Sequence, residues 1–209
     1  MKNPKRNLLV LLTACFLSLS CQNKTFKTKE TLWQYLKNPE NGYLLQKTIN
    51  GIDYSLLYKP TDVLVAQEYN SNNPKDLQKL KDKYKDQMYF SLSMSKNNHE
   101  LLSHLARDKQ RFGAMVNQLA FEMGSKVHVF TQSKDTLPLT DYVYPRMYGA
   151  TGSTSMLFVY PKSREYLQDT YLNFSIEDLG FSTGEVRFKF PTKLIKDPPK
   201  LIFDSNKPQ

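Results

Sequence analysis

YLLQKTINGIDYSLLY, residues 43–58, places two β-like runs on either side of the dipeptide Asn50-Gly51. Asn-Gly is the strongest short-range hairpin signal, because the favoured two-residue turn needs positive φ at both central positions. The sequence therefore predicts two strands, Tyr43 to Ile49 and Ile52 to Tyr58, that pair antiparallel to each other.

Further strands are predicted on the C-terminal side of this hairpin. Tyr89 to Ser95 alternates like a strand, and Val186, Phe188 and Phe190 alternate with Arg187 and Lys189, which predicts one buried and one basic face. Five strand candidates fill the last third: Lys126 to Thr131, Leu139 to Tyr144, Ser155 to Tyr160, Thr170 to Ile176 and Glu185 to Phe190. Because no helix separates them, they favour antiparallel pairing.

Helices are expected before and between these strands. Thr28 caps a short helix that ends near Lys37, and Leu77, Leu80 and Tyr84 form the apolar stripe of a helix over Lys75 to Lys85. Val63 to Tyr69 fits helix or strand, with helix favoured. The longest helical pattern runs from His99 to Met123, with Gly124 at the place of a C-terminal cap. The predicted class is α+β: an antiparallel sheet or sandwich in the C-terminal half, with the mid-chain helices packed on one face.

The N-terminus carries the pattern of an export signal. A basic patch at Lys2, Lys5 and Arg6 precedes the uncharged stretch LLVLLTACFLSL, residues 8–19, which is too short to span a bilayer. Ser20 and Cys21 follow, and the chain then turns polar. This border resembles the lipobox of bacterial lipoproteins, in the relaxed form of Bacteroidota-type bacteria, and the resemblance implies lipidation of Cys21. Cys15, after Leu-Thr-Ala, is the alternative modified residue, and an unlipidated secretory signal is the other.

These assignments predict the domain boundaries of the chain and its cellular location. We expect a signal peptide over 1–20, a lipidated tether over 21–27, a single α+β domain over 28–195 and an extended tail over 196–209. The remainder has the general look of uncharacterised envelope lipoproteins of the same group. The expected location is the cell envelope. Gln22 rather than Asp follows the cysteine, and resemblance to the enterobacterial lipoprotein sorting rule implies the outer membrane rather than the inner.

The positions of the cysteines and the distribution of charge exclude several kinds of functional site and partner. Both cysteines of the chain, Cys15 and Cys21, lie in the signal region, so the domain has no disulfide, thiolate nucleophile or cysteine-ligated metal. The net charge of +9 falls to +6 once Lys2, Lys5 and Arg6 are removed. Because the remaining charges are spread along the sequence rather than clustered, no nucleic-acid partner is expected; anionic lipid head groups are a weak preference.

The histidines do not complete a recognised metal motif. His99 and His104 stand five residues apart, so one helix would point them about 140° apart and away from a shared ion. Glu100, His104 and Asp108 would share a helix face, for which a solvated surface is the favoured interpretation. His128 is expected on the face of its strand opposite Val127 and Val129.

The polar loop Gly149 to Ser155 is the remaining candidate site. It lacks the Lys and the following helix of a P-loop, so a connection between two strands is favoured. As a binding loop it would gather Arg146, Tyr148 and Ser153 around a polar or anionic ligand. Tyr142 and Tyr144, with Tyr148, could form an aromatic patch beside it.

We therefore expect a membrane-anchored lipoprotein that acts by binding or as an accessory or scaffold component; the membrane is the expected partner, and an envelope protein is the candidate second partner. No catalytic residue, cofactor or metal is assigned. The alternative is an enzyme: a hydrolase with Ser153 or Ser155 as nucleophile and His104 or His128 as base, or a metal-dependent enzyme using Glu100, His104 and Asp108.

Overall fold

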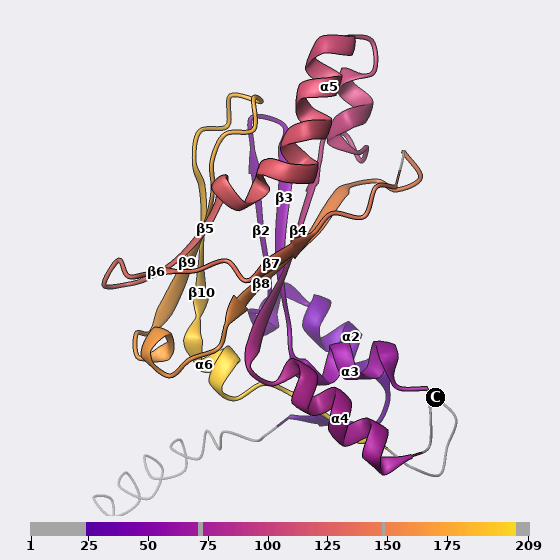
Figure 1. The fold of residues 1–209 in the computed structure, drawn as a ribbon, viewed down its shortest axis with the longest axis vertical. Helices are drawn as coiled ribbons and strands as arrows, with labels where there is room; N and C mark the ends of the chain where they lie inside the picture. Colours follow the sequence, from indigo (N-terminus) through magenta and orange to yellow (C-terminus); the bar gives the residue numbers. More distant parts are fainter. Residues whose placement is uncertain (1–23, 71–72, 148, 204–209) are drawn as a thin grey trace, which may run out of the picture.

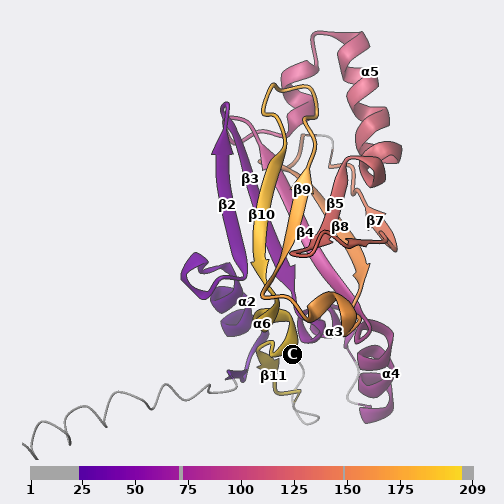
Figure 2. The same cartoon turned by 90° about the vertical axis from the view of Figure 1, so that its left-hand side faces the viewer.

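Two antiparallel sheets form the centre of the protein, seen in a computed structural model that describes residues 24–70, 73–147 and 149–203 (Figure 1). One sheet has five strands in the order β2 (Leu44–Ile49), β3 (Ile52–Lys59), β4 (Gln87–Ser95), β8 (Thr154–Pro161) and β7 (Asp141–Val143). The other has four, in the order β10 (Val186–Pro191), β9 (Tyr171–Ile176), β5 (Val127–Thr131) and β6 (Thr136–Leu137). Figure 2 looks at the second sheet in front of the first.

The predicted hairpin is present and joins the larger sheet. Asn50 and Gly51 both have positive φ, 49° and 72°, which the two-residue turn requires. The hairpin pairs β2 with β3, and β3 continues the sheet by pairing with β4. Since β4 then pairs with β8, strands from both halves of the sequence share this sheet.

The core lies between the two sheets and is rich in aromatic side chains. Alternate residues of β8 are buried, as are Val186, Phe188 and Phe190 of β10, while Arg187 and Lys189 are exposed as predicted. Phe90 on β4 is fully buried, and its ring centre is 5.5 Å from those of both Phe174 and Phe190 in the opposite sheet. One continuous apolar cluster therefore holds both sheets.

The helices lie at the two ends of this pair of sheets. α2 (Lys29–Lys37), α3 (Thr61–Glu68) and α4 (Pro74–Tyr84) are at the lower end in Figure 1, and α5 (Lys109–Asn117) projects at the upper end. The predicted α+β class with antiparallel sheets is confirmed; the mid-chain helices, however, are divided between the ends rather than gathered on one face. Val63 to Tyr69 is resolved in favour of helix, and the side chain of Thr28 caps α2 by accepting from Thr31 N.

The long helix predicted from His99 to Met123 is wrong as a single element. A 3-10 turn, η2 (Leu101–Leu105), precedes α5, and a π turn, η3 (Gln118–Glu122), and a 3-10 turn, η4 (Met123–Ser125), follow it. The helix begins anew because Asp108 is extended and its carboxylate accepts from Arg111 N.

Gly124 is not the predicted left-handed cap, since it is absent from the positive-φ glycines of the described chain. A Cβ atom there would lie 3.2 Å from Leu139 Cδ2. The absence of a side chain at Gly124 therefore lets the Leu139 side chain pack closely against the backbone.

The segments predicted as a tether and a trailing tail are joined to the domain and to each other. β1 (Thr25–Phe26) pairs in parallel with β11 (Lys200–Leu201), and Leu201 N donates to the Asp62 carboxylate of α3 at 2.8 Å. The short helix α6 (Thr192–Lys196) leads into this pair. The chain is thus fixed to the helical end from residue 25 at one side and through residue 202 at the other.

The predicted signal peptide and both cysteines lie outside the described residues. Within the described ranges, no helix combines the length and the apolar character that crossing a bilayer demands.

Alkaline pH should unfold this protein, because burial raises the pKa of Tyr43, Tyr58 and Tyr160 and raises that of Tyr89 to about 12. The unfolded chain ionises these phenols near pH 10. The contribution of the neutral phenols to stability is therefore complete below about pH 10 and is lost as the pH rises towards the folded-state values. Tyrosinate absorbance and circular dichroism should change together above pH 10, and Tyr160→Phe should weaken the pH dependence. Ionisation of all thirteen phenols near pH 10 with the secondary structure intact would contradict the expected coupling.

Candidate functional site

A buried carboxylate fixes the connection between β7 and β8. Glu100 is only 3% exposed, and its oxygens accept from Gly149 N at 3.1 Å, Thr151 N at 3.2 Å and the Thr151 hydroxyl at 2.7 Å. The interpretation of Glu100 as part of a solvated helix face is therefore wrong. Its backbone (φ −58°, ψ 146°) lies before η2 and outside any helix, which turns the side chain inward towards the loop.

Two further contacts hold the same loop against the segment that follows β4. Leu101 N donates to the Thr154 hydroxyl at 2.9 Å in a buried setting. A Cβ atom on Gly152 would lie 3.2 Å from Asn98 O, so the absence of a side chain lets the two backbones approach. The connection between two strands expected here is thus present, and it is tightly held rather than free.

An apolar hollow of about 400 Å³ lies at the α5 end of the molecule. Its wall combines apolar side chains from three segments with a few polar groups. The lining residues are Leu102, Ala106, Phe112, Val116, Tyr144, Glu100, Ser103, Arg146 and Gly149. A concave apolar wall with few polar groups is the usual form of a small-molecule site.

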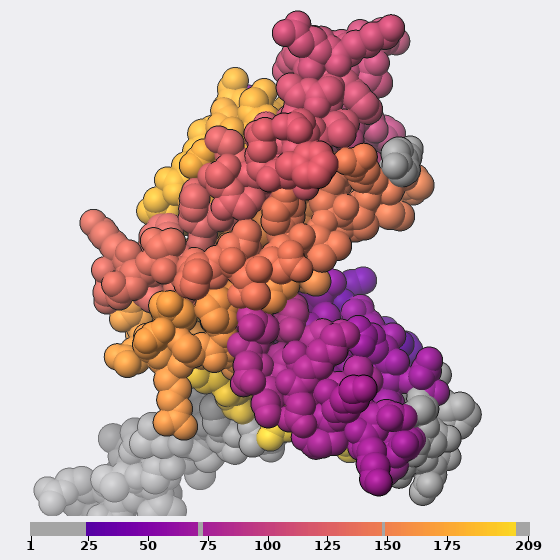
Figure 3. All heavy atoms as spheres, viewed as in Figure 1, coloured from indigo at the N-terminus to yellow at the C-terminus, as the bar shows by residue number. Residues whose placement is uncertain are grey.

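Large apolar side chains are also exposed on the elements that line this hollow or adjoin them in the chain. Phe121 is 73% exposed, Val143 51%, Met147 42% and Phe112 37%, and they belong to η3, to β7 and its following loop, and to α5. Figure 3 shows α5 and its neighbouring turns as the projecting upper end of the surface. Apolar surface gathered in this way marks a binding region more often than chance exposure does.

A second hollow, of about 530 Å³, lies on the solvent face of the larger sheet and is polar. Hydroxyl groups line it: Ser93 Oγ donates to Ser153 Oγ at 2.8 Å and also bonds Ser155 Oγ at 2.8 Å. Arg146 and Ser153, both named as candidate ligand residues, thus line different hollows, on either side of the loop over 149–152. Tyr148, the third candidate, lies outside the described residues.

The two tyrosines that flank this loop are partly buried against the core rather than presented as a patch. Tyr142 stacks on Phe158 of β8, with ring centres 5.8 Å apart and planes at 20°. Tyr144 lines the apolar hollow.

The Ser–His pairing that a hydrolase would need is not formed. Ser153 and Ser155 bond Ser93 and each other, and Ser153 O accepts from the Thr151 hydroxyl, whereas His104 Nε2 contacts Lys96 O at 2.8 Å. His128 belongs to the opposite sheet and contacts Glu177. Among the described residues, therefore, no hydrogen bond joins a candidate base to a candidate nucleophile.

The residues considered for a metal site are engaged separately. Glu100 holds the loop, Asp108 caps α5, and His104 contacts a backbone carbonyl. The common helix face expected for them does not exist, because α5 starts only at Lys109. In the part of the chain that the structure describes, no group of three His, Cys, Asp or Glu side chains is arranged to hold a metal ion.

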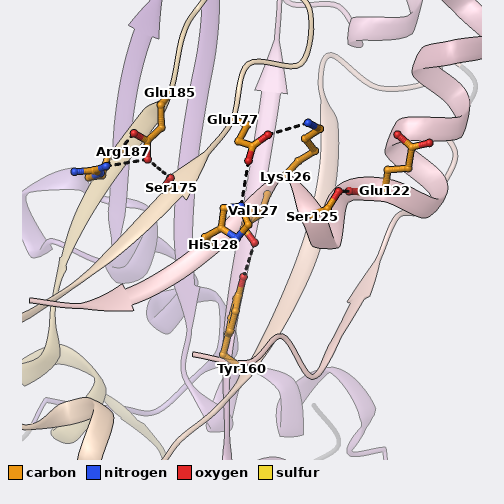
Figure 4. Close-up of polar contacts among 10 residues, drawn as sticks. All are labelled: Glu122, Ser125, Lys126, Val127, His128, Tyr160, Ser175, Glu177, Glu185 and Arg187. Carbon is orange, nitrogen blue, oxygen red and sulfur yellow. Dashed lines mark hydrogen bonds and ion pairs between the residues drawn. The ribbon is translucent and has the colours of Figure 1, made fainter. Parts of the chain in front are cut away.

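His128 lies on the outer face of the smaller sheet, as its strand pattern predicts (Figure 4). Glu177 accepts from Lys126 Nζ at 2.8 Å and lies 3.3 Å from His128 Nε2, and these contacts, Lys126 first, lower the pKa of its carboxyl. Next to them Glu185 bonds Ser175 and Arg187. The contacts of Glu177 with His128 and of Glu185 with Ser175 join neighbouring strand segments on a solvated face, a common stabilising feature of sheets, whereas Glu185 and Arg187 pair along one segment.

The protein is thus an α+β domain of two packed sheets, with the apolar hollow of about 400 Å³ at one end. No family model matches the chain, and no curated protein does. Among solved structures it is similar to a crystal structure of a "novel protein of unknown function" from Burkholderia pseudomallei K96243. That likeness has 8% sequence identity and a TM-score of 0.42, and covers 79% of this chain and 86% of the other. So distant a likeness carries no argument about function.

Glu100→Gln should loosen the loop between β7 and β8. The amide has one acceptor oxygen instead of two, so a part-buried loop donor loses its partner and the buried NH₂ group finds no acceptor, at a cost of about 1–3 kcal/mol. Denaturant unfolding should show this loss, and hydrogen exchange at Gly149 and Thr151 should accelerate. Glu165→Gln, at an exposed position, is the matched control and should change stability by less than about 0.5 kcal/mol. Equal effects of the two variants would show that the Glu100 contacts do not stabilise the loop.

Proposed function

We propose that this protein is a lipid-anchored envelope protein that binds a small amphipathic molecule with an apolar body and an anionic head. The apolar hollow between η2, α5 and the β7–β8 connection is the observation that carries the proposal. Its volume of about 400 Å³ lies in the range of small-molecule sites, roughly 300–1,000 Å³.

The wall of the hollow suits the apolar body of such a ligand. Leu102, Phe112 and Val116 provide aliphatic and aromatic surface, and transfer of a ligand's apolar surface from water to this wall is favourable. The loop side of the hollow is pre-shaped by the Glu100 hydrogen bonds, so little ordering is needed when a ligand enters.

Arg146 is the group that would hold the anionic head. It is exposed, it lines the hollow, and it belongs to none of the ion pairs formed among the described residues. A guanidinium offers a planar set of donors that matches a carboxylate or phosphate. The sequence suggests Arg146 as part of a ligand-binding loop, and the proposal adds that its guanidinium binds the anionic group of the ligand.

The anchor is the second part of the proposal. The lipobox-like border at Cys21, with the basic and apolar segments before it, supports the proposed location in the cell envelope, with the outer membrane favoured. Two acyl chains or more bind a bilayer firmly, at about 0.8 kcal/mol per buried methylene. The domain would then present its binding site from a membrane surface.

Ligand binding can be tested with anilinonaphthalene sulfonate, a fluorescent probe that has an apolar ring system and an anionic group. Ala106→Trp places a large side chain at the hollow and should weaken probe binding about tenfold or more. Arg146→Gln should weaken it about fivefold, as expected for the loss of roughly 1 kcal/mol from a partly exposed ion pair.

Matched variants separate this site from non-specific adsorption. Ala114→Trp lies on the same helical end but does not line the hollow, and Arg164→Gln removes an exposed arginine elsewhere. Both should bind the probe as the unmodified chain does. If Ala106→Trp and Ala114→Trp change the affinity equally, the hollow is not the binding site.

Anchoring can be tested in the bacterium that encodes the chain. Cys21→Ala should abolish incorporation of labelled fatty acid and release the protein from the membrane fraction, whereas Cys15→Ala should leave both unchanged. The reverse pattern would move the lipid to Cys15, and labelling that survives both substitutions would contradict lipidation at either cysteine.

A further inference from the structure

Nearly all the net charge of the described chain lies at one end of the molecule. We define the lysine pole as the described residues of the ranges 24–42, 59–86 and 191–203, which form β1, α2, α3, α4, α6 and β11. It contains thirteen lysines, no arginine and eight acidic residues, a net charge of +5, whereas the rest of the described chain has twelve basic and eleven acidic residues. This separation is invisible along the sequence, because the pole is assembled from three distant segments.

The lysine pole is one continuous surface. α3 contacts α2, α4 and β11, and β1 contacts both α2 and β11. Figure 1 shows these elements together at the lower end, opposite α5. Within this pole Lys83 pairs with Glu68 and Lys85 with Asp82, so most of its lysines form no ion pair with a described carboxylate.

The N-terminal segment enters the fold at this same pole. Thr25 lies in β1, four residues after Cys21. Four extended residues span at most about 14 Å. A lipid on Cys21 would therefore hold β1 and its neighbours close to the head groups of the membrane.

We propose that the lysine pole docks on the anionic head groups of a lipid bilayer and so orients the protein, with the apolar hollow facing away from the membrane. The orientation rests on the proposed anchor at Cys21, but the attraction to anionic lipid does not. A cationic surface near an anionic bilayer gains about fivefold in binding for each lysine that reaches the head groups. The opposite end, with almost no net charge, gains nothing comparable.

Vesicle binding tests the docking surface separately from the anchor. The full-length chain carrying Cys21→Ala is used throughout, so that no arm depends on lipidation. Its partition onto vesicles of phosphatidylcholine alone is compared with that onto vesicles in which part of this lipid is replaced by phosphatidylglycerol. The ratio of the two partition coefficients removes any uncharged contribution of residues 8–19.

A pole variant and a matched control then locate the effect. Lys27→Gln, Lys79→Gln and Lys200→Gln together remove three exposed pole charges and should lower the ratio by up to about a hundredfold. Lys109→Gln, Lys134→Gln and Lys189→Gln change the net charge equally outside the pole and should leave the ratio within about twofold. About 1 M salt, with a Debye length near 3 Å, should abolish the gain on anionic vesicles.

Three results would overturn the proposal: no gain on phosphatidylglycerol vesicles, an equal loss in both triple variants, or a gain that survives high salt. Binding of duplex DNA through the same three lysines, without a gain on anionic vesicles, would assign the pole to nucleic acid instead. Because the cysteine is absent in every arm, failure here leaves the anchor to be judged by lipid labelling alone.

Discussion

The contact of Phe90 with the aromatic side chains of the opposite sheet is the interaction on which the rest of the molecule depends. Its ring meets Phe174 and Phe190, and Tyr58 on the next strand also meets Phe190, with ring centres 5.3–5.5 Å apart throughout this group. The chain has no cysteine after Cys21, so no disulfide supports the described domain. Burial of apolar surface between the sheets must hold the domain together.

The two ends and the two outer faces of this pair of sheets are not needed for the core, and they carry different kinds of side chain. At one end, the lysine pole carries thirteen lysines and includes the first and last described strands, β1 and β11; at the other, α5 and the β7–β8 connection border an apolar hollow. The outer faces carry cross-strand polar groups, such as Ser93 with Ser155 on one sheet and His128 with Glu177 on the other. The net positive charge and the apolar hollow thus lie at opposite ends of the molecule, the arrangement on which the proposed docking and ligand binding rest.

Glu100 shows how a polar residue can be placed in the interior without instability. Its carboxylate accepts three hydrogen bonds from one loop, and these offset the cost of removing it from water. As a result, the loop over 149–152 is held in place between the apolar hollow and the second, polar hollow. A loop held in this way is suited to positioning Arg146, although that side chain itself remains exposed.

The sequence by itself determined the features that depend on neighbouring residues. The Asn50-Gly51 turn, the cap at Thr28 and the alternation of Val186, Phe188 and Phe190 are local signals, since φ preference, capping and strand period act within a few residues. The Asp108 cap that restarts the helix at Lys109 is also local, since its carboxylate bonds Arg111 N three residues on. Only the tertiary structure decided that Glu100 turns inward and that residues 25–26 pair with residues 200–201. These outcomes depend on contacts between residues far apart in the chain, and neither periodicity nor composition contains that information. The same reason explains the lysine pole, where charges that are diluted along the sequence become concentrated once the chain has folded.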